Sequence, residues 1–261
     1  MQQHRGGAEL AERIAMLPQP LLVALDVDGT LAPIVEDPSQ ARVPPGIADT
    51  LRQLHAPPAV SIALVTGRDA ASLAAIAPIE SVYRAVEHGR VVLRPGEVFV
   101  APAIDPELRA ALLRFESLAR ARFAPRGARI EVKASACAVH TRALATHDSS
   151  SAETILADAE ALALHVGLHP RRGRSVLEAE TLPGDKGAAI DRLVELTGAV
   201  SVVYAGDDLT DGPAIERAMQ RGIGIFVASS DRPTAPSPCT ASLAGPDAVA
   251  ALIRTLAARL C

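Results

Sequence analysis

The sequence predicts an α/β protein with a doubly wound, mostly parallel, Rossmann-like core and an inserted α+β domain. Near both ends of the chain, short apolar runs alternate with helical stretches, as in βαβ units of a parallel sheet. The middle of the chain instead follows the order α-β-β-α-β-β. We therefore expect residues 1–102 and 181–261 to form the core and residues 103–180 to form the insert.

The first part of the core begins with the apolar run "LLVALD", for which we expect a strand at 21–26. A helix near 45–55, a strand and turn at 59–67, and a short helix at 69–77 follow. The segment "VYRAVEHG" reads as another strand and turn. Pro95-Gly96 between two apolar runs in "RVVLRPGEVFV" predicts a hairpin. Residues 1–18 fit either a helix or a frayed arm.

The insert begins with helical periodicity over 105–122, followed by two strand-like runs at 128–133 and 136–142. A helix at about 150–166 and the short runs "GLHPR" and "SVLEA" complete it. The core resumes with a helix at 185–197, the strand "AVSVVYAGDD", a helix at 210–220, the strand "GIGIFVA" and a final helix from about 246. Residues 229–241 read as an irregular loop, and segments 102–105 and 180–185 as hinges.

Composition argues against several classes of function. The formal net charge is −4 and the arginines are scattered, so the chain has no basic stripe for nucleic acid. No apolar run approaches the roughly 20 residues that span a bilayer, so we expect a cytoplasmic protein without a membrane partner. We also expect a monomer. Only two of the 26 basic residues are lysines, Lys133 and Lys186. Lysine survives in such a chain either by accident or where a compact ammonium is needed.

Polar clusters stand directly after three predicted core strands. They are Asp26 with Asp28, Thr66-Gly67-Arg68, and Gly206-Asp207-Asp208 with Asp211. Because the carboxyl ends of parallel strands form one crevice, these clusters should meet there. Lys186, at the start of the helix after the insert, can reach the same place.

Converging carboxylates repel one another unless a cation lies between them. Oxygen ligands without clustered His or Cys favour Mg²⁺. The hydroxyl of Thr66, the backbone amides around Gly29 and Gly67, and the Lys186 ammonium would then bind phosphoryl oxygens. Arg68 is a further candidate for this, although an Arg at a helix start is often simply solvated.

Simpler readings exist for each cluster taken alone. Asp-Gly is common in turns, and the aspartates at 207, 208 and 211 could cap a helix. A calcium loop of the EF-hand type is disfavoured, because its glycine position, counted from Asp26, holds Leu31. For all of the clusters together, a functional site is favoured.

In this order, "DVDGT", "VTGR", "DKG" and "GDDLTD" resemble the four motifs of the haloacid-dehalogenase-like (HAD) phosphohydrolases. The resemblance implies that Asp26 attacks phosphorus to form an aspartyl phosphate, and that Asp28 protonates the leaving group and then activates water. It also implies Mg²⁺ held by Asp26, Asp28 through its carbonyl oxygen, and Asp207. Asp211 would orient metal-bound waters, and Asp208 either does so too or faces the helix start.

The insert lies where this superfamily places a cap over the active site. Three stretches, "LDVDGTLAPIVEDPSQA", "IEVKASACAVHTR" and "GRSVLEAETLPGDKGAAI", with "VEHG" at 86–89, resemble the trehalose-6-phosphate phosphatases. The resemblance implies that the substrate is this small-molecule sugar phosphate and that its sugar contacts Glu131, Lys133, His140, Arg142, Arg174 and Glu178. In extended strands, Glu131 would share a face with Lys133, and His140 with Arg142.

Two departures bear on the sugar. The chain reads "EAET" where the family commonly has "EVRP", and "HTR" where "HYR" is more usual. A polar sheet face can also be only a face open to water. The alternatives are a phosphatase for another sugar or glycosyl phosphate, a sugar-phosphate-binding module without catalysis, and a phosphomutase.

Overall fold

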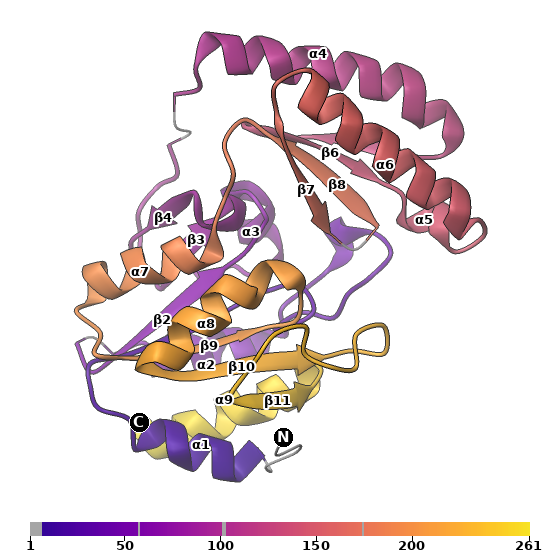
Figure 1. The fold of residues 1–261 in the computed structure, drawn as a ribbon. Helices are drawn as coiled ribbons and strands as arrows, with labels where there is room; N and C mark the ends of the chain where they lie inside the picture. The colour runs from indigo at the N-terminus through magenta and orange to yellow at the C-terminus, as the bar shows by residue number, and fades with distance from the viewer. Residues whose placement is uncertain (1–6, 57, 101–102, 174) are drawn as a thin grey trace. The chain divides into compact units, whose positions relative to one another are not determined.

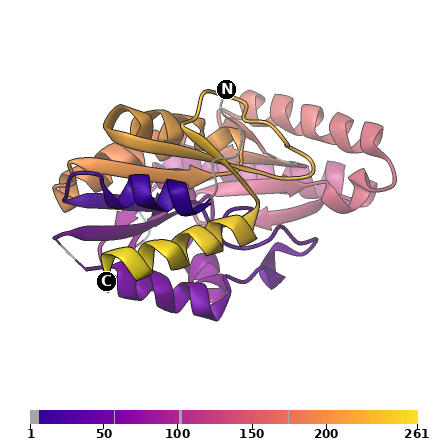
Figure 2. The same ribbon diagram turned by 90° about the horizontal axis from the view of Figure 1, so that it is seen from below.

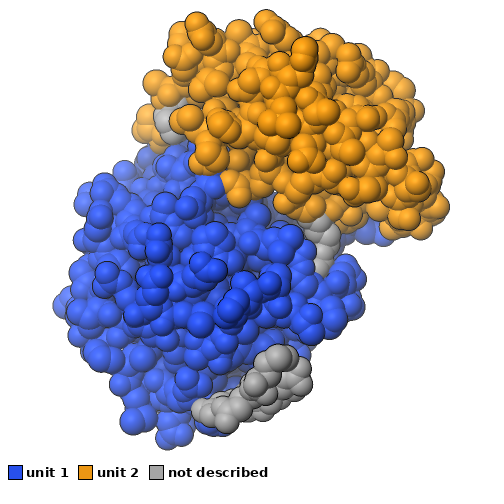
Figure 3. Space-filling model, viewed as in Figure 1, with its two compact units in different colours: residues 1–99, 184–261 blue, residues 100–183 orange. Residues whose placement is uncertain are grey.

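The computed structural model describes residues 7–56, 58–100, 103–173 and 175–261. The chain divides into two compact units, residues 1–99 with 184–261 and residues 100–183 (Figure 3). The expectation that the first unit is catalytic and the second is a cap stays a prediction. None of the helices in the described part of the chain is long and apolar enough to cross a membrane.

The first unit, called the core unit below, is built on one sheet. Within the described residues this sheet has seven strands in the order β11-β10-β9-β1-β2-β3-β4, and β4 alone runs antiparallel to its neighbour. Their bounds are β1 (Leu21–Leu25), β2 (Val60–Val65), β3 (Tyr83–Val86), β4 (Val91–Leu93), β9 (Ser201–Gly206), β10 (Gly222–Ala228) and β11 (Ala241–Ala244). β1 lies between β2 and β9, so the winding direction of the chain reverses there.

Helices cover both faces of the core sheet (Figures 1 and 2). α7 (Lys186–Thr197) and α8 (Gly212–Arg221) pack on one face. α1 (Gly7–Ala15), α2 (Pro45–Leu54), α3 (Ala70–Ile76) and α9 (Pro246–Leu260) pack on the other. Central strands covered on both sides need continuous apolar runs, and the "LLVAL" of β1 is buried at every position. The predicted doubly wound, mostly parallel fold class is confirmed.

The second unit, called the insert unit below, is an antiparallel sheet with helices on one face (Figure 1). Its described strands follow the order β5-β6-β8-β7. In chain order its elements are α4 (Pro106–Phe123), β5 (Arg129–Val132), β6 (Ala136–His140), α5 (Arg142–Ala145), α6 (Ser149–His165), β7 (His169–Gly173) and β8 (Val176–Glu180). Apolar residues of α4 and α6 bury one face, with Cys137, Val139 and Leu177 beneath them. The opposite face carries the polar alternate positions.

The structure corrects two expectations about local elements and decides a third that was open, the helix or arm near the start of the chain. The predicted hairpin at 90–100 is wrong, because only Val91–Leu93 is a strand and it pairs with β3. After it, Val98 and Val100 are exposed and stand outside the sheet. The loop predicted at 229–241 gives way to β11 at Ala241, and residues Gly7–Ala15 form a helix. The hinge candidate Pro102 lies outside the described residues.

Candidate active site

The carboxyl ends of β1, β2 and β9 bring the predicted polar clusters to one edge of the core sheet. Asp26 follows β1, Thr66 follows β2 and Asp207 follows β9. β1 pairs along its whole length with both β2 and β9, with Leu25 opposite both Leu64 and Ala205. Residues 26, 66 and 207 therefore leave the sheet at nearly the same level, at the crevice where the winding direction changes.

Three carboxylates form a compact group at this edge. Asp26, Asp207 and Asp211 each offer an oxygen, and these oxygens all lie within 4.8 Å of one another. Close approach of the β1 loop makes the group possible. A Cβ at Gly29 would collide with the Asp207 carboxylate, and Gly29 has a φ of +81°, a conformation that favours glycine. The sequence "DVDGT" therefore needs its glycine for both space and backbone shape.

Lys186 enters the group from the start of α7. The side chain of Asp185 caps this helix by accepting a hydrogen bond of 2.7 Å from the Gly187 backbone amide. The Lys186 ammonium donates to Asp26 Oδ1 and to Asp211 Oδ1, both at 2.7 Å. Burial alone would lower the pKa of Lys186, but the carboxylates of Asp211 and Asp26 outweigh it and raise the pKa. The ammonium is therefore a permanent cation in the site.

The group still carries excess negative charge, because one ammonium faces three buried carboxylates. Burial raises the pKa of Asp26 well above its usual range, and the nearby Asp211 and Asp207 raise it further, against the opposing effect of Lys186. A carboxyl in this position ionises more readily when a further cation is bound. The donor set is made of anionic oxygens, so the three residues fit a hard metal ion.

Asp28 lies apart from this group. Its two oxygens accept hydrogen bonds of 2.7 Å from Nε and a terminal nitrogen of Arg68, which forms a planar fork around the carboxylate. Arg68 also donates to the carbonyl of Pro38 at 2.8 Å, and its backbone amide donates to Thr66 Oγ1 at 3.1 Å. Arg68 is thus engaged with the carboxylate of the "DVD" motif rather than simply solvated.

Two neighbours hold the loop after β2. The backbone amide of His88 donates to the Thr66 carbonyl at 2.9 Å, and the amide of Glu87 donates to the Arg68 carbonyl at 2.8 Å. A Cβ at Gly67 would collide with the His88 ring, so Gly67 permits this close contact. Thr66 itself is buried.

The loop after β9 also contains contacts that sequence reasoning missed. The Asp208 carboxylate forms an ion pair with Arg232, which lies far along the chain between β10 and β11. Asp211 Oδ2 accepts a hydrogen bond of 2.8 Å from the Asp208 amide. The hydroxyl of Tyr204 donates to Asp211 Oδ1 at 2.6 Å. Tyr204 precedes Gly206 by two positions on β9, so strand periodicity could have marked it as sharing a face with the site.

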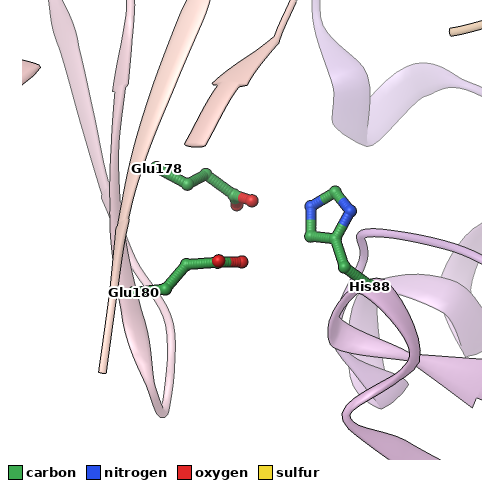
Figure 4. Close-up of side chains that lie close together, drawn as sticks. All are labelled: His88, Glu178 and Glu180. Carbon is green, nitrogen blue, oxygen red and sulfur yellow. The ribbon is translucent and has the colours of Figure 1, made fainter. Parts of the chain in front are cut away.

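In the insert unit, the strand register aligns one polar row across the sheet. Glu131 lies opposite Ala138, Ala138 opposite Glu178, and Glu178 opposite Arg171. Glu178 and Glu180 point to the same side of β8 (Figure 4). Sequence reasoning missed Arg171, whose Nε donates to Glu180 at 3.1 Å. The segment "HPRRG" is too short for its alternation to show which of its two arginines faces this side.

Ion pairs and hydrogen bonds connect the predicted residues on this face. Lys133 pairs with Glu178. A ring nitrogen of His140 lies 2.7 Å from Glu131 Oε2. This hydrogen bond, with help from the Lys133 charge and against partial burial, lowers the pKa of Glu131 to about 2. Glu131 is therefore an anion throughout the physiological range.

Arg142 differs from the expectation. The strand ends at His140, and Arg142 begins the short helix α5, so the two do not alternate along one extended strand. Thr141 follows the strand directly, and its backbone amide donates to the Ser175 carbonyl at 2.8 Å. Arg174, the remaining predicted sugar ligand, lies outside the described residues.

Comparisons with known proteins cover the residues described above. The family model described as trehalose-phosphatase matches residues 24–247. A protein of Mycobacterium tuberculosis named as an uncharacterized glycosyl hydrolase is 33% identical over 251 residues, covering 91% of this chain and 18% of the relative. Trehalose 6-phosphate phosphatase RA3 of Zea mays is 29% identical over 267 residues, covering 91% of this chain and 70% of the relative. The chain thus spans less than a fifth of the mycobacterial relative.

Solved structures share the fold. The C-terminal domain of a Candida albicans trehalose-6-phosphate phosphatase superposes with a TM-score of 0.79 at 21% identity, covering 99% of this chain and 98% of that domain. A haloacid dehalogenase-like hydrolase from Bacteroides thetaiotaomicron superposes with a TM-score of 0.62 at 15% identity, covering 89% of this chain and 98% of the other. The HAD-like fold is therefore confirmed.

Proposed function

The chain belongs to the trehalose-phosphatase family, and we propose that it hydrolyses trehalose 6-phosphate to trehalose and inorganic phosphate. The observation that carries this proposal is the buried contact of the Lys186 ammonium with Asp26 and Asp211, beside Asp207. A nucleophilic carboxylate, a permanent cation and a set of metal-binding oxygens are the parts that phosphoryl transfer from an ester requires.

In the proposed reaction, an oxygen of Asp26 attacks phosphorus and the bond between phosphorus and the sugar oxygen breaks. The sugar oxygen takes a proton from Asp28, and an aspartyl phosphate is left on Asp26. Asp28 then removes a proton from water, which attacks the phosphorus, releases inorganic phosphate and restores the Asp26 carboxylate. The Arg68 fork holds Asp28 for both proton transfers.

The remaining residues of the edge bind the phosphoryl group. Lys186, the hydroxyl of Thr66 and the backbone amides near Gly29 and Gly67 supply positive charge and donors for its oxygens. The proposed cofactor is Mg²⁺, held by Asp26 and Asp207 with the carbonyl of Asp28. Asp211, whose oxygens accept from Lys186, Tyr204 and the Asp208 amide, would orient metal-bound waters. When bound, Mg²⁺ supplies Lewis acidity to the transferring phosphoryl group.

The sugar is assigned to the polar sheet face of the insert unit, which we propose acts as the cap. Carboxylates such as Glu131 and Glu178 accept hydrogen bonds from sugar hydroxyls, and Lys133, His140 and Arg142 donate. Arg174 belongs to the same proposal. A pyranose offers hydroxyls on all sides, so a group of residues with both acceptors and donors suits a disaccharide. We also propose that the enzyme acts as a monomer in the cytoplasm.

The test measures both products from purified protein supplied with trehalose 6-phosphate and Mg²⁺. We expect one inorganic phosphate for each free trehalose, no release in EDTA, and recovery when Mg²⁺ is restored. An isomerised sugar phosphate without free phosphate would indicate a mutase. Tight binding without any product would indicate a module without catalysis. Either result would overturn the proposed activity.

A further inference from the structure

Tyr204 is a buried residue that the reaction above does not use. It lies on β9 with its side chain completely buried. Its hydroxyl donates to Asp211 Oδ1 at 2.6 Å, and the same oxygen accepts from the Lys186 ammonium at 2.7 Å. Lys186 also donates to Asp26. A continuous chain of hydrogen bonds thus runs from Tyr204 through Asp211 and Lys186 to the nucleophile.

The side chain of Tyr204 has fewer rotatable bonds than the lysine it assists. It packs with Ala189, Ile190 and Leu193 of α7, the helix that Lys186 begins. A tyrosine has two rotatable side-chain bonds and a planar ring, whereas lysine carries its ammonium on a flexible four-carbon chain. The tyrosine therefore supplies a fixed reference point for Asp211, and Asp211 supplies one for Lys186.

Both oxygens of Asp211 are occupied by protein donors. Oδ1 accepts from Tyr204 and Lys186, and Oδ2 accepts from the Asp208 backbone amide. Asp211 has no exposed surface, and a Cβ at Gly206 would collide with its carboxylate. Loss of the Tyr204 donor would leave Lys186 as the only side-chain donor to Oδ1 among these contacts, so that the flexible lysine alone would hold this oxygen.

Tyr204 acts as a donor near neutral pH, because the ordinary pKa of a tyrosine is about 10. The phenol therefore keeps its proton, as a hydrogen bond to a carboxylate requires.

We propose that Tyr204 is a positioning residue whose hydroxyl fixes Asp211 so that Lys186 stays directed at Asp26. The proposal concerns the arrangement of the site in the protein without substrate or metal. Its catalytic consequence alone rests on the proposed function. Tyr204→Phe removes the hydroxyl and keeps the ring, so it tests the hydrogen bond with little change in packing.

The chain offers an unusually simple readout, because it contains only two lysines and two tyrosines. Protein labelled with ¹³C at lysine Cε should give two side-chain NMR signals, assigned with Lys133→Arg. We expect Tyr204→Phe to shift the Lys186 signal and leave the Lys133 signal in place. Tyr83→Phe is the matched control, since Tyr83 lies on β3 and its ring packs nearly perpendicular to that of His55, with the ring centroids 5.9 Å apart. It should move neither signal.

The catalytic arm separates positioning from stability. We expect Tyr204→Phe to lower kcat on the order of tenfold with little change in KM, as for loss of one hydrogen bond to a charged group. Thermal unfolding of both variants reports the folded fraction. An unchanged Lys186 signal in folded Tyr204→Phe, or a kcat equal to that of Tyr83→Phe, would overturn the proposal. If wild-type protein has no phosphatase activity but Tyr204→Phe still shifts the Lys186 signal, the proposed function is overturned and this inference stands.

If the Tyr204→Phe chain does not fold, a second measurement tests the proposal. Incorporation of 3-fluorotyrosine into Tyr83→Phe places a single, more acidic phenol at position 204 with almost no change in volume. A stronger hydrogen bond to Asp211 should shift the Lys186 signal relative to the same protein with ordinary tyrosine. An unshifted signal would count against the proposal without any substitution at position 204.

Discussion

The Lys186 ammonium lies 2.7 Å from Asp26 Oδ1, although 160 residues separate the two in the chain. The insert unit, residues 100–183, accounts for about half of that interval, and α7 begins with Lys186 shortly after it. The contact is fully buried and is shared with Asp211. It joins the first and third motifs of the sequence into one electrostatic unit.

Removal of the ammonium should cost both stability and activity. Lys186→Met leaves two buried carboxylates without their cation, so we expect the free energy of unfolding to fall by about 3–5 kcal/mol. The loss of charge stabilisation should lower kcat roughly 10²- to 10³-fold where the variant folds. Urea unfolding and phosphate release measure the two effects. Arg217→Ala breaks the exposed pair between α7 and α8 and serves as the control, with a change within about 0.5 kcal/mol. Equal losses in both variants would contradict the account.

The fork of Arg68 on Asp28 predicts a defect that lysine cannot repair. Arg68→Lys keeps the charge but cannot make both hydrogen bonds in one plane. We expect kcat to fall roughly tenfold or more, because Asp28 would no longer be held for proton transfer. Arg42 donates to the nearby backbone carbonyls of Ser39 and Ala41 and not to a carboxylate in these contacts, so Arg42→Lys is the matched control. An Arg68→Lys variant with the kcat of wild type would contradict the role assigned to Arg68 in holding Asp28.

The contact of Gly29 with Asp207 predicts the effect of a single added methyl group. In Gly29→Ala, the Cβ must displace the Asp207 carboxylate, and alanine must adopt a positive φ. At Mg²⁺ a hundredfold above its Kd, wild-type protein should gain about 2.7 kcal/mol, or roughly 5–10 °C in Tm. Gly29→Ala should lose most of this Mg²⁺-dependent shift. Gly46→Ala, where a Cβ meets no atom within 4 Å, should retain it. A full shift in Gly29→Ala would contradict the metal assignment.

The low pKa of Glu131 predicts acid sensitivity. Because the His140 hydrogen bond lowers this pKa from 4.5 to about 2, the ionised form is favoured by folding. The stabilisation is therefore present above pH 4.5 and is lost as the pH falls towards 2. Glu131→Gln should flatten the decline of Tm in this window. Glu153 is an exposed glutamate of α6, and Glu153→Gln should keep the wild-type decline. An identical decline of Tm with falling pH in wild type and Glu131→Gln would refute the link between Glu131 ionisation and stability.

Much of the core could be predicted because its signals are local. The alternation of apolar runs and helical stretches gives the parallel sheet, and a residue directly after a strand must stand at its edge. Asp26, Thr66 and Asp207 follow from that rule alone. Lys186 was singled out because lysine is rare in this chain, and the structure places it at the start of α7.

The features that escaped prediction depend on distant parts of the chain. The ion pair of Arg232 with Asp208 joins residues in different loops, and no local pattern reveals it. The end of β6 at His140 depends on the turn into α5, so Arg142 could not be placed by alternation. The run at 98–100 is apolar enough for a strand, but Phe99 packs against the apolar core outside the sheet while Val98 and Val100 are exposed. Sequence periodicity does not report which of these arrangements the chain adopts.

The most direct test of the central claim compares kcat/KM for trehalose 6-phosphate with kcat/KM for sucrose 6-phosphate, glucose 6-phosphate and mannosylglycerate phosphate. The purified protein is assayed in Mg²⁺, and Asp26→Asn is measured beside it as the background. We expect a strong preference for the trehalose ester and no turnover by Asp26→Asn. A preference for another ester would contradict the assignment of the insert unit. Metal-dependent turnover retained by Asp26→Asn would contradict the chemistry assigned to the core unit.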